Sequence, residues 1–257
     1  MVRVTTTDRR TVLRASAGLV TAGAFTTGCG TSGAVPHPTR FRAPAKPSPA
    51  PGPRRLPGLP AQLTHGPRTH PRVALTFHGN GDPATAHALL REAEQAGARV
   101  TVLAVGTWLD AHPDVSRRIL DGGHDLGNHT LHHLGINDMS EAEARVEIEG
   151  CAQRLRRLTG SIGSWFRPSR AARASPLVER LARETGYPHV LSYDVDSLDF
   201  TSPGAPAVTR EVLGGIRAGS VVSLHFGYAD TVAALPAVLE ELDRRGLAAV
   251  TTTELFS

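Results

Sequence analysis

The stretch Gly127-Asn128-His129-Thr130-Leu131-His132-His133 places three imidazoles within five residues. His129 and His133 are four positions apart, and on a helical turn this spacing puts both side chains on one face. Neutral imidazole is a good ligand for zinc and other first-row divalent metals. The spacing therefore predicts that His129 and His133 bind one metal ion. The alternative is a polar surface turn rich in histidine, and the surrounding sequence has to decide between them.

Residues 71–257, which contain this stretch, alternate short apolar runs with helical patterns. Strands are predicted at 72–77, 100–105, 164–166, 190–193, 221–225 and 248–252. Helices are predicted at 84–96, 113–121, 140–158, 176–184, 209–217 and 231–245. This alternation predicts an α/β fold with a parallel sheet or barrel, in which functional side chains gather at the carboxyl ends of the strands.

Polar side chains occur where the predicted strands end. They are His78 with Asn80 and Asp82, the pair His129 and His133 after the short segment 125–127, Arg167, the group Asp194, Asp196 and Asp199, and His225. Because the carboxyl ends of parallel strands meet at one edge, these five groups are expected to form one site. This coincidence, more than any single motif, favours a metal-dependent enzyme.

These motifs resemble those of the polysaccharide deacetylase family, the NodB-like carbohydrate esterases. Residues 127–133 match the family's G-N-H-(S/T)-x-x-H metal motif. Residues 196–200 resemble D-S-x-D-W with Phe200 in place of Trp, 223–225 resemble L-x-H, and Arg167 matches the arginine of R-x-P-x-G. The resemblance implies a distorted (β/α) barrel over 71–257. It also implies a divalent metal, zinc before cobalt or nickel, that serves to remove acetyl groups from N-acetylated sugars.

The chain departs from the family at the first motif. The family has T-F-D-D-G, whose first Asp is the catalytic base and whose second is a metal ligand, whereas this chain has His78 and Gly79 there. In one interpretation, Asp82 is the third metal ligand and His78 the base. In another, His78 completes a three-histidine site, which zinc accepts. In a third, the altered domain only binds its glycan.

The resemblance implies a role for each remaining residue. Arg167 would orient the base or a neighbouring carboxylate. His225, held protonated by a carboxylate such as Asp196, would donate a proton to the departing amine. The expected substrate is an N-acetylated polysaccharide of cell-wall or chitin type. The alternatives are a non-catalytic glycan-binding protein and a metal-dependent amidase or esterase with a small substrate.

The first 70 residues differ in composition from the rest. Arg9-Arg10 and a small-residue apolar run ending at Cys29 predict an export signal over 1–29, of twin-arginine or lipoprotein type. The proline-rich residues 30–70 are predicted to be a disordered linker. The domain would then be extracellular, or held at the membrane by a lipid on Cys29, and would face the cell wall.

The charge of the chain is also uneven. Residues 1–70 hold ten Lys and Arg residues and one acid, which leaves 18 basic and 23 acidic residues in 71–257. A nucleic-acid-binding fold carries its basic charge on the folded domain. The acidic balance of 71–257 therefore argues against a nucleic-acid partner.

Overall fold

The computed structural model describes residues 50–257, so the predicted export signal and the first part of the predicted linker lie outside the described residues. The strands are β1 (Gln62–Leu63), β2 (Arg72–Gly79), β3 (Thr101–Ala104), β4 (Asp125–Asn128), β5 (Val190–Leu191), β6 (Val195–Asp196), β7 (Val221–His225) and β8 (Ala248–Ala249). The helices are α1 (Pro83–Gln95), α2 (Gly106–Ala111), α3 (Pro113–Asp121), α4 (Glu141–Thr159), α5 (Pro176–Thr185), α6 (Ala205–Gly215), α7 (Ala229–Arg244) and α8 (Thr252–Leu255). Two 3-10 turns are η1 (Ile136–Asp138) and η2 (Asp199–Thr201).

The strands pair in parallel in the order β4-β3-β2-β7-β6, and β8 also pairs with β2. Phe166 continues the series, because it bridges Asn128 on one side and Val190 of β5 on the other. Only residues 192–194 separate β5 from β6 along the chain, so the two ends of the series come back together. The predicted α/β fold is confirmed, with parallel strands arranged as a distorted barrel.

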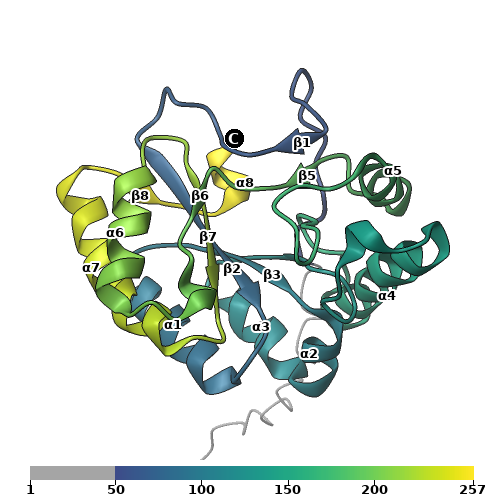
Figure 1. Cartoon of the computed structure of the whole chain (residues 1–257), viewed down its shortest axis with the longest axis horizontal. Coiled ribbons are helices and arrows are strands. Elements are labelled where there is room, and N and C mark those ends of the chain that lie inside the picture. Colours follow the sequence, from purple (N-terminus) through teal and green to yellow (C-terminus); the bar gives the residue numbers. More distant parts are fainter. Residues whose placement is uncertain (1–49) are drawn as a thin grey trace, which may run out of the picture. The chain divides into compact units, whose positions relative to one another are not determined.

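Helices cover the outside of these strands. In Figure 1, α1, α6 and α7 lie on one side and α4 and α5 on the other, with β2 between them. The main core forms around β2, in which Val73, Leu75 and Phe77 are almost completely buried. None of the helices within residues 50–257 is both long and apolar enough to cross a membrane.

The prediction of a disordered linker up to residue 70 is wrong for residues 50–70. The backbone N–H of Ala50 donates to the carbonyl of Thr159 at 2.9 Å, and Leu63 in β1 is 2% exposed. β1 pairs with β5, and His65 forms a bridge with Ser220. These partners are more than 100 residues away in sequence, so the proline-rich composition gave no sign of them.

Other predicted elements differ from the structure in their bounds: the strand predicted at 190–193 is β5 (Val190–Leu191), and the helix predicted at 209–217 is α6 (Ala205–Gly215). The strand predicted at 164–166 is reduced to the single bridging residue Phe166. The strand predicted at 248–252 ends at Ala249, because Thr251 and Glu254 form a capping box that starts α8.

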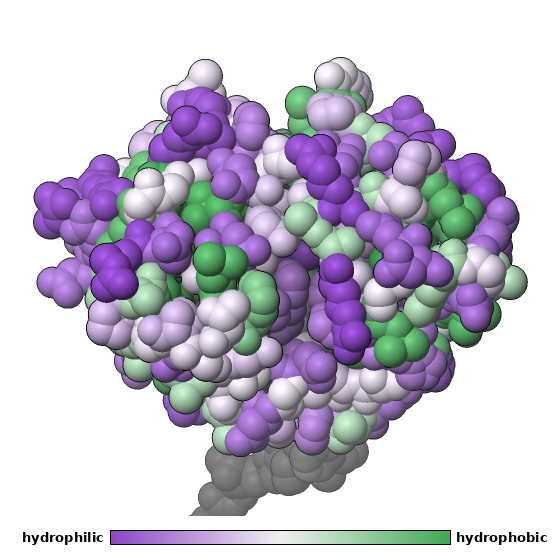
Figure 2. Space-filling model, viewed as in Figure 1, coloured by the Kyte–Doolittle hydropathy of each residue, from purple (hydrophilic) through white to green (hydrophobic). Residues whose placement is uncertain are grey.

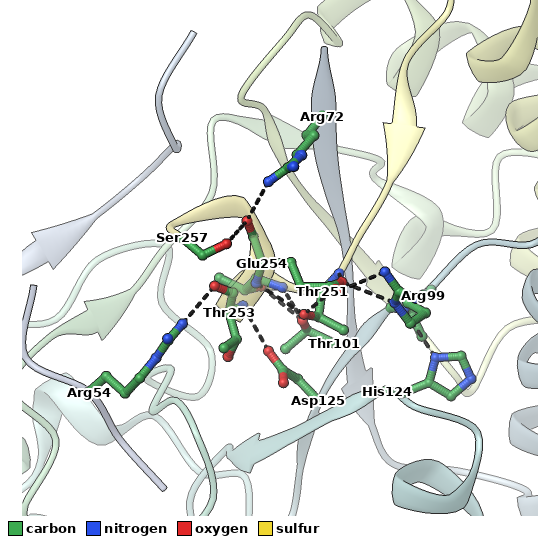
Figure 3. A network of polar contacts seen from close by, with 12 residues as sticks. Arg54, Arg72, Arg99, Thr101, His124, Asp125, Thr251, Thr253, Glu254 and Ser257 are labelled. Atoms are coloured by element: carbon green, nitrogen blue, oxygen red, sulfur yellow. Dashed lines mark hydrogen bonds and ion pairs between the residues drawn. The ribbon is translucent and has the colours of Figure 1, made fainter. Parts of the chain in front are cut away.

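Helix α8 lies in a network of polar contacts with residues at the beginnings of the strands (Figure 3). The Glu254 carboxylate accepts two hydrogen bonds from Arg99, and its carbonyl accepts one from Arg72 at 3.2 Å. Asp125, at the start of β4, accepts the Thr253 N–H at 2.9 Å. These contacts tie the beginnings of β2 and β4 to the last helix and leave the carboxyl ends for the site.

Gly127 allows β4 to approach its neighbour closely. A Cβ at this position would lie 2.6 Å from the Trp165 carbonyl oxygen and 2.7 Å from Leu103 Cδ1. We therefore expect Gly127→Ala to lower the free energy of unfolding by about 1–3 kcal/mol in urea denaturation. Gly214→Ala in α6, where a Cβ would meet open space, should cause no loss. Equal stability of Gly127→Ala and the unaltered protein would contradict this account of the packing.

Candidate metal centre

The register of β2 and β7 brings two histidines together. His78 pairs directly with His225 across these parallel strands, and their ring centroids lie 4.2 Å apart. Thr76 and Ser223 form a pair on the same face two residues earlier, and Ser223 Oγ lies 3.4 Å from His78 Nε2. The inner face of both strands is therefore polar at its carboxyl end.

The same register adds His129 from β4. β2 pairs with β3 and β3 with β4, which places Gly79, Ala104 and Asn128 in one row at the edge of the sheet. His129 follows directly, and its N–H donates to the Ala104 carbonyl at 3.0 Å. Its ring centroid lies 4.3 Å from that of His78.

The segment after β4 is a loop, so the prediction of a helical turn over 129–133 is wrong. Thr130 and His133 both have left-handed backbones, with φ of 70° and 59°. Such angles are rare for residues other than glycine and concentrate at functional sites. The loop reverses direction and brings the His133 ring to a centroid distance of 4.9 Å from His129.

Side chains of the neighbouring elements hold this loop in place. Asn128 Oδ1 accepts the Thr130 N–H at 2.9 Å, while its amide nitrogen donates to the Ile148 carbonyl on α4. Both carboxylate oxygens of Glu147 bind His132, one at the backbone N–H and one at Nδ1, at 2.8 and 2.6 Å. His132 is therefore directed to α4, and His129 and His133 remain for the site.

The three histidines form a cluster of potential metal ligands. One ring nitrogen each from His78, His129 and His133 lie within 4.8 Å of one another. In Figure 2 a hollow with hydrophilic residues at its bottom opens near the centre of the face, close to the carboxyl end of β2 in the matching view of Figure 1. His129 is fully buried, and the other two rings are half-buried.

The three histidines are in the neutral form that a metal cation requires. Burial, followed by the charges of the neighbouring histidines, lowers the pKa of His78 and of His129 well below 6.5. Burial and the charge of Arg170 also lower the pKa of His133. All three imidazoles are therefore neutral near pH 7, the form that binds metals.

His129 has the tautomer of a metal ligand. Its Nδ1 lies 3.1 Å from the carbonyl oxygen of Arg167, which can only accept, so Nδ1 carries the hydrogen. Its Nε2 is buried and has no hydrogen-bond partner among the described residues. A buried polar atom without a partner is costly, and a cation between the three rings would satisfy it.

Asp82 does not join this cluster. It is exposed and forms the N-cap of α1, where its carboxylate accepts the Ala84 N–H at 2.8 Å. The interpretation in which Asp82 is the third metal ligand is therefore wrong for this structure. Aspartate followed by Pro83 at the first helical position is a common helix start, and this local signal could have predicted the cap.

The partner of His225 is Asp199, which corrects the prediction of Asp196. Asp199 Oδ1 lies 2.6 Å from His225 Nδ1, and Oδ2 accepts the His225 N–H at 2.8 Å and the Thr231 hydroxyl at 2.6 Å. Burial raises the pKa of Asp199, but these hydrogen bonds outweigh it and the net shift is downward. The ionised carboxylate accepts the Nδ1 hydrogen and leaves Nε2 of His225 free.

The backbone between Asp196 and Asp199 explains why Asp199 is the partner of His225. Asp196 pairs with Ser223, two residues before His225, and its Oδ1 accepts the Leu198 N–H at 3.1 Å. Leu198 then turns the chain with a φ of 54° and directs Asp199 back beneath His225. The sequence motif contains both acids, but only this turn decides which of them reaches the imidazole.

Arg167 lies inside the barrel and is completely buried. Its guanidinium donates to Thr76 Oγ1 at 2.8 Å and to the carbonyls of Leu191 and Ser192 at 3.2 and 3.0 Å. Burial lowers its pKa to about 10, so it stays charged at neutral pH. All three acceptors are neutral, so the hydrogen bonds of Arg167 within residues 50–257 do not reach a base or carboxylate, and the role of orienting one stays a prediction. Arg167 joins β2 to the segment that follows β5.

Comparisons with known proteins agree with this geometry. The sequence profile of the polysaccharide deacetylase family matches residues 65–190. A peptidoglycan-N-acetylglucosamine deacetylase of Bacillus cereus is 31% identical over 196 residues, which cover 72% of this chain and 87% of that protein. The chain belongs to the polysaccharide deacetylase family.

Other relatives of this chain include a chitooligosaccharide deacetylase of a Bradyrhizobium species, 28% identical over 197 residues that cover 68% of this chain and 85% of that protein. Among solved structures, the Bc1960 peptidoglycan N-acetylglucosamine deacetylase superposes with a TM-score of 0.71 at 27% identity. That match covers 76% of this chain and 92% of the other.

The packing around β2 excludes a side chain at one position where this chain departs from the first deacetylase motif. At Gly79, where the family has its second Asp, a Cβ would lie 2.8 Å from Val102 Cγ1 and 3.1 Å from the Cα of Ala104. The sheet therefore leaves no room for a side chain at that position. His78 takes the place of the first Asp and contacts the other histidines of the cluster.

The buried imidazoles should make the stability of the metal-free protein depend on pH. The pKa of His129 is lowered in the folded state, whereas an unfolded histidine titrates near 6.5. Below pH 6.5 the unfolded chain therefore binds a proton at His129, whereas His129 in the folded protein stays neutral. The free energy of unfolding should fall by up to about 1.4 kcal/mol per pH unit for this group as the pH decreases.

Urea denaturation of the metal-free protein at a series of pH values measures this effect. His129→Asn removes the group, so its stability should fall less steeply below pH 6.5. His70→Asn, at an exposed histidine, should keep the original slope. The prediction fails if His129→Asn follows the slope of the unaltered protein.

Proposed function

We propose that the protein is a metal-dependent deacetylase that hydrolyses acetamido groups of an N-acetylated glycan. One observation carries this proposal: His129, whose buried Nε2 has no hydrogen-bond partner within residues 50–257, clusters with two further imidazoles beside the His225–Asp199 pair. Membership of the polysaccharide deacetylase family supports the reaction class. The peptidoglycan and chitooligosaccharide deacetylases among its relatives support a glycan of cell-wall or chitin type as substrate.

His78, His129 and His133 would hold the metal ion. Three neutral nitrogen ligands with one open position are a common catalytic zinc site, and cobalt or nickel can replace zinc with such ligands. When bound, the ion would supply Lewis-acid polarisation of the acetyl carbonyl and an acidified water. This assignment adopts the interpretation in which His78 completes a three-histidine site. His78 is then a metal ligand, and the interpretation of His78 as the base is set aside.

His225 is then the residue that moves the proton. Its Nδ1–H is fixed by Asp199, so Nε2 can accept a proton from the attacking water and the buried carboxylate stabilises the imidazolium. The same Nε2–H can then protonate the amide nitrogen as the C–N bond breaks. The products are acetate and the free amine of the sugar, and His225 returns to its neutral form.

The cellular location is also part of the proposal. The paired arginines and the apolar run before Cys29 support export, by a twin-arginine or lipoprotein route. An exported deacetylase would meet the cell-wall glycan directly. A membrane contact would then come only from a lipid on Cys29.

A non-catalytic glycan-binding protein is the second candidate. One observation favours it: among residues 50–257, no carboxylate joins the three histidines, so the two acids of the first family motif have no direct replacement. A protein of this kind would bind glycan and release no acetate.

Acetate release from chitooligosaccharide and peptidoglycan by the zinc-loaded protein tests the enzyme assignment. Asp199→Asn should lower the rate of acetate release by about 100-fold or more, because the amide cannot stabilise the charged His225. Its zinc content should stay unchanged, since Asp199 does not touch the three histidines. Asp196→Asn is the matched control and should keep the rate within a few-fold.

Two results would contradict the proposal. If zinc-loaded protein releases no acetate from either glycan, the deacetylase assignment is rejected and the non-catalytic glycan-binding candidate is supported. Equal rates for Asp199→Asn and the unaltered enzyme would remove His225 and Asp199 from the mechanism.

A further inference from the structure

Ser223 and His78 both depart from the motifs of the family, and their side chains contact each other. The L-x-H motif has leucine where this chain has Ser223, and the T-F-D-D-G motif has aspartate where it has His78. The Ser223 hydroxyl oxygen lies 3.4 Å from Nε2 of His78. A leucine at this position has no polar atom and could not accept a hydrogen from the imidazole. The serine is therefore complementary to the histidine.

The register of the strands brings Ser223 next to His78. Ser223 pairs with Thr76 across β7 and β2, two residues before the pair of His225 and His78. Side chains two residues apart in a strand share one face of the sheet, so Ser223 points to the same side as His225. Ser223 is only 1% exposed. Its contact with His78 therefore lies inside the barrel, away from bulk water.

The neighbouring polar side chains leave the Ser223 hydroxyl to His78. Asp196 pairs with Ser223 from β6, but its carboxylate accepts a backbone N–H of its own turn. The Thr76 hydroxyl is bound by Arg167 and donates to a backbone carbonyl of β7. Within residues 50–257, the Ser223 hydroxyl has no hydrogen-bond partner other than His78.

The two ring nitrogens of His78 have different surroundings. Nε2 contacts Ser223, whereas Nδ1 makes no hydrogen bond to the described part of the chain. In that part, the only buried side-chain nitrogen or oxygen without a hydrogen-bond partner is Nε2 of His129, so Nδ1 of His78 is open to a ligand from outside the protein. A histidine that binds a metal through one nitrogen donates the hydrogen on the other to an acceptor. His129 has such an acceptor in the Arg167 carbonyl, and Ser223 is the corresponding acceptor for His78.

We propose that Ser223 is a positioning residue for the metal centre: its hydroxyl oxygen accepts the Nε2 hydrogen of His78 and so directs Nδ1 to the metal ion. This inference rests on the proposed function, in which His78 is a metal ligand. The ion would then be bound by Nδ1 of His78 and by Nε2 of His129, since the hydrogen on the other nitrogen of each ring goes to a protein acceptor. Ser223 acts through His78 and does not touch the substrate.

Zinc affinity measures this role without turnover. Competition with a chelator of known affinity gives the zinc dissociation constant of the whole protein. Ser223→Ala should raise this constant about tenfold or more, because a histidine ligand that loses its hydrogen-bond partner holds its metal less tightly. Ser223→Thr keeps the hydroxyl and should keep the dissociation constant within about threefold. Ser164→Ala is the matched control, at a buried serine whose hydroxyl makes one hydrogen bond, to the Pro51 carbonyl at 3.5 Å, and should cause no change.

A second comparison separates this role from a general effect on folding. Because Ser223 acts only through the imidazole, Ser223→Ala should cause no further loss of zinc affinity in a protein that already carries His78→Ala. A purely structural role of the serine would weaken zinc binding equally in both backgrounds.

Nitrogen NMR of the zinc-loaded protein, with nitrogen-15 in its histidines, identifies the tautomer of His78. We expect a hydrogen on Nε2 and the metal on Nδ1. The His78 signals are assigned by their loss in His78→Ala. A hydrogen on Nδ1 of His78 would overturn the inference.

The inference is also overturned if Ser223→Ala binds zinc as tightly as the unaltered protein, or if its effect is the same with and without His78. A protein that shows the expected zinc affinities and releases no acetate would contradict the proposed function and leave the Ser223 assignment standing. An active deacetylase whose zinc affinity is unchanged by Ser223→Ala would have the opposite meaning.

Discussion

The parallel register of β4, β3, β2 and β7 is the constraint on which the site depends. It sets His78 opposite His225 and places His129 one residue beyond the row that Gly79 and Asn128 share. A shift of one residue in any of these pairings would turn the side chains to the other face of the sheet. Arg167 and α8 support this register from inside the barrel and from its opposite end. The histidines meet because the strands are held in line.

Replacement of the family's first two aspartates changes the charge of the site more than its shape. Gly79 packs against β3 with no space for a side chain, while His78 turns inward as a neutral ligand candidate. Compared with the family motif, the site lacks two carboxylates yet contains the buried cation Arg167. The His225–Asp199 pair joins an imidazole next to His78 to a buried carboxylate, whereas the His132–Glu147 pair is directed to α4.

Local patterns in the sequence predicted most of the fold, and long-range contacts account for what was missed. Helix α3 and strand β7 were predicted with their observed bounds, because proline, glycine and apolar runs mark them locally. The choice of Asp199 over Asp196 depends on the left-handed turn at Leu198, which no local signal marks. Residues 50–70 were mistaken for linker because their partners lie far along the chain. The role of Asp82 as the N-cap of α1, by contrast, is marked locally by Pro83 and could have been predicted.

The most direct test of this account is a crystal structure of the zinc-loaded protein, with the metal located by anomalous scattering at the zinc edge. We predict one zinc ion bound by ring nitrogens of His78, His129 and His133, with Asp82 still capping α1. Zinc bound through the Asp82 carboxylate, or bound away from the Nε2 of His129, would contradict the three-histidine centre and the reaction built on it.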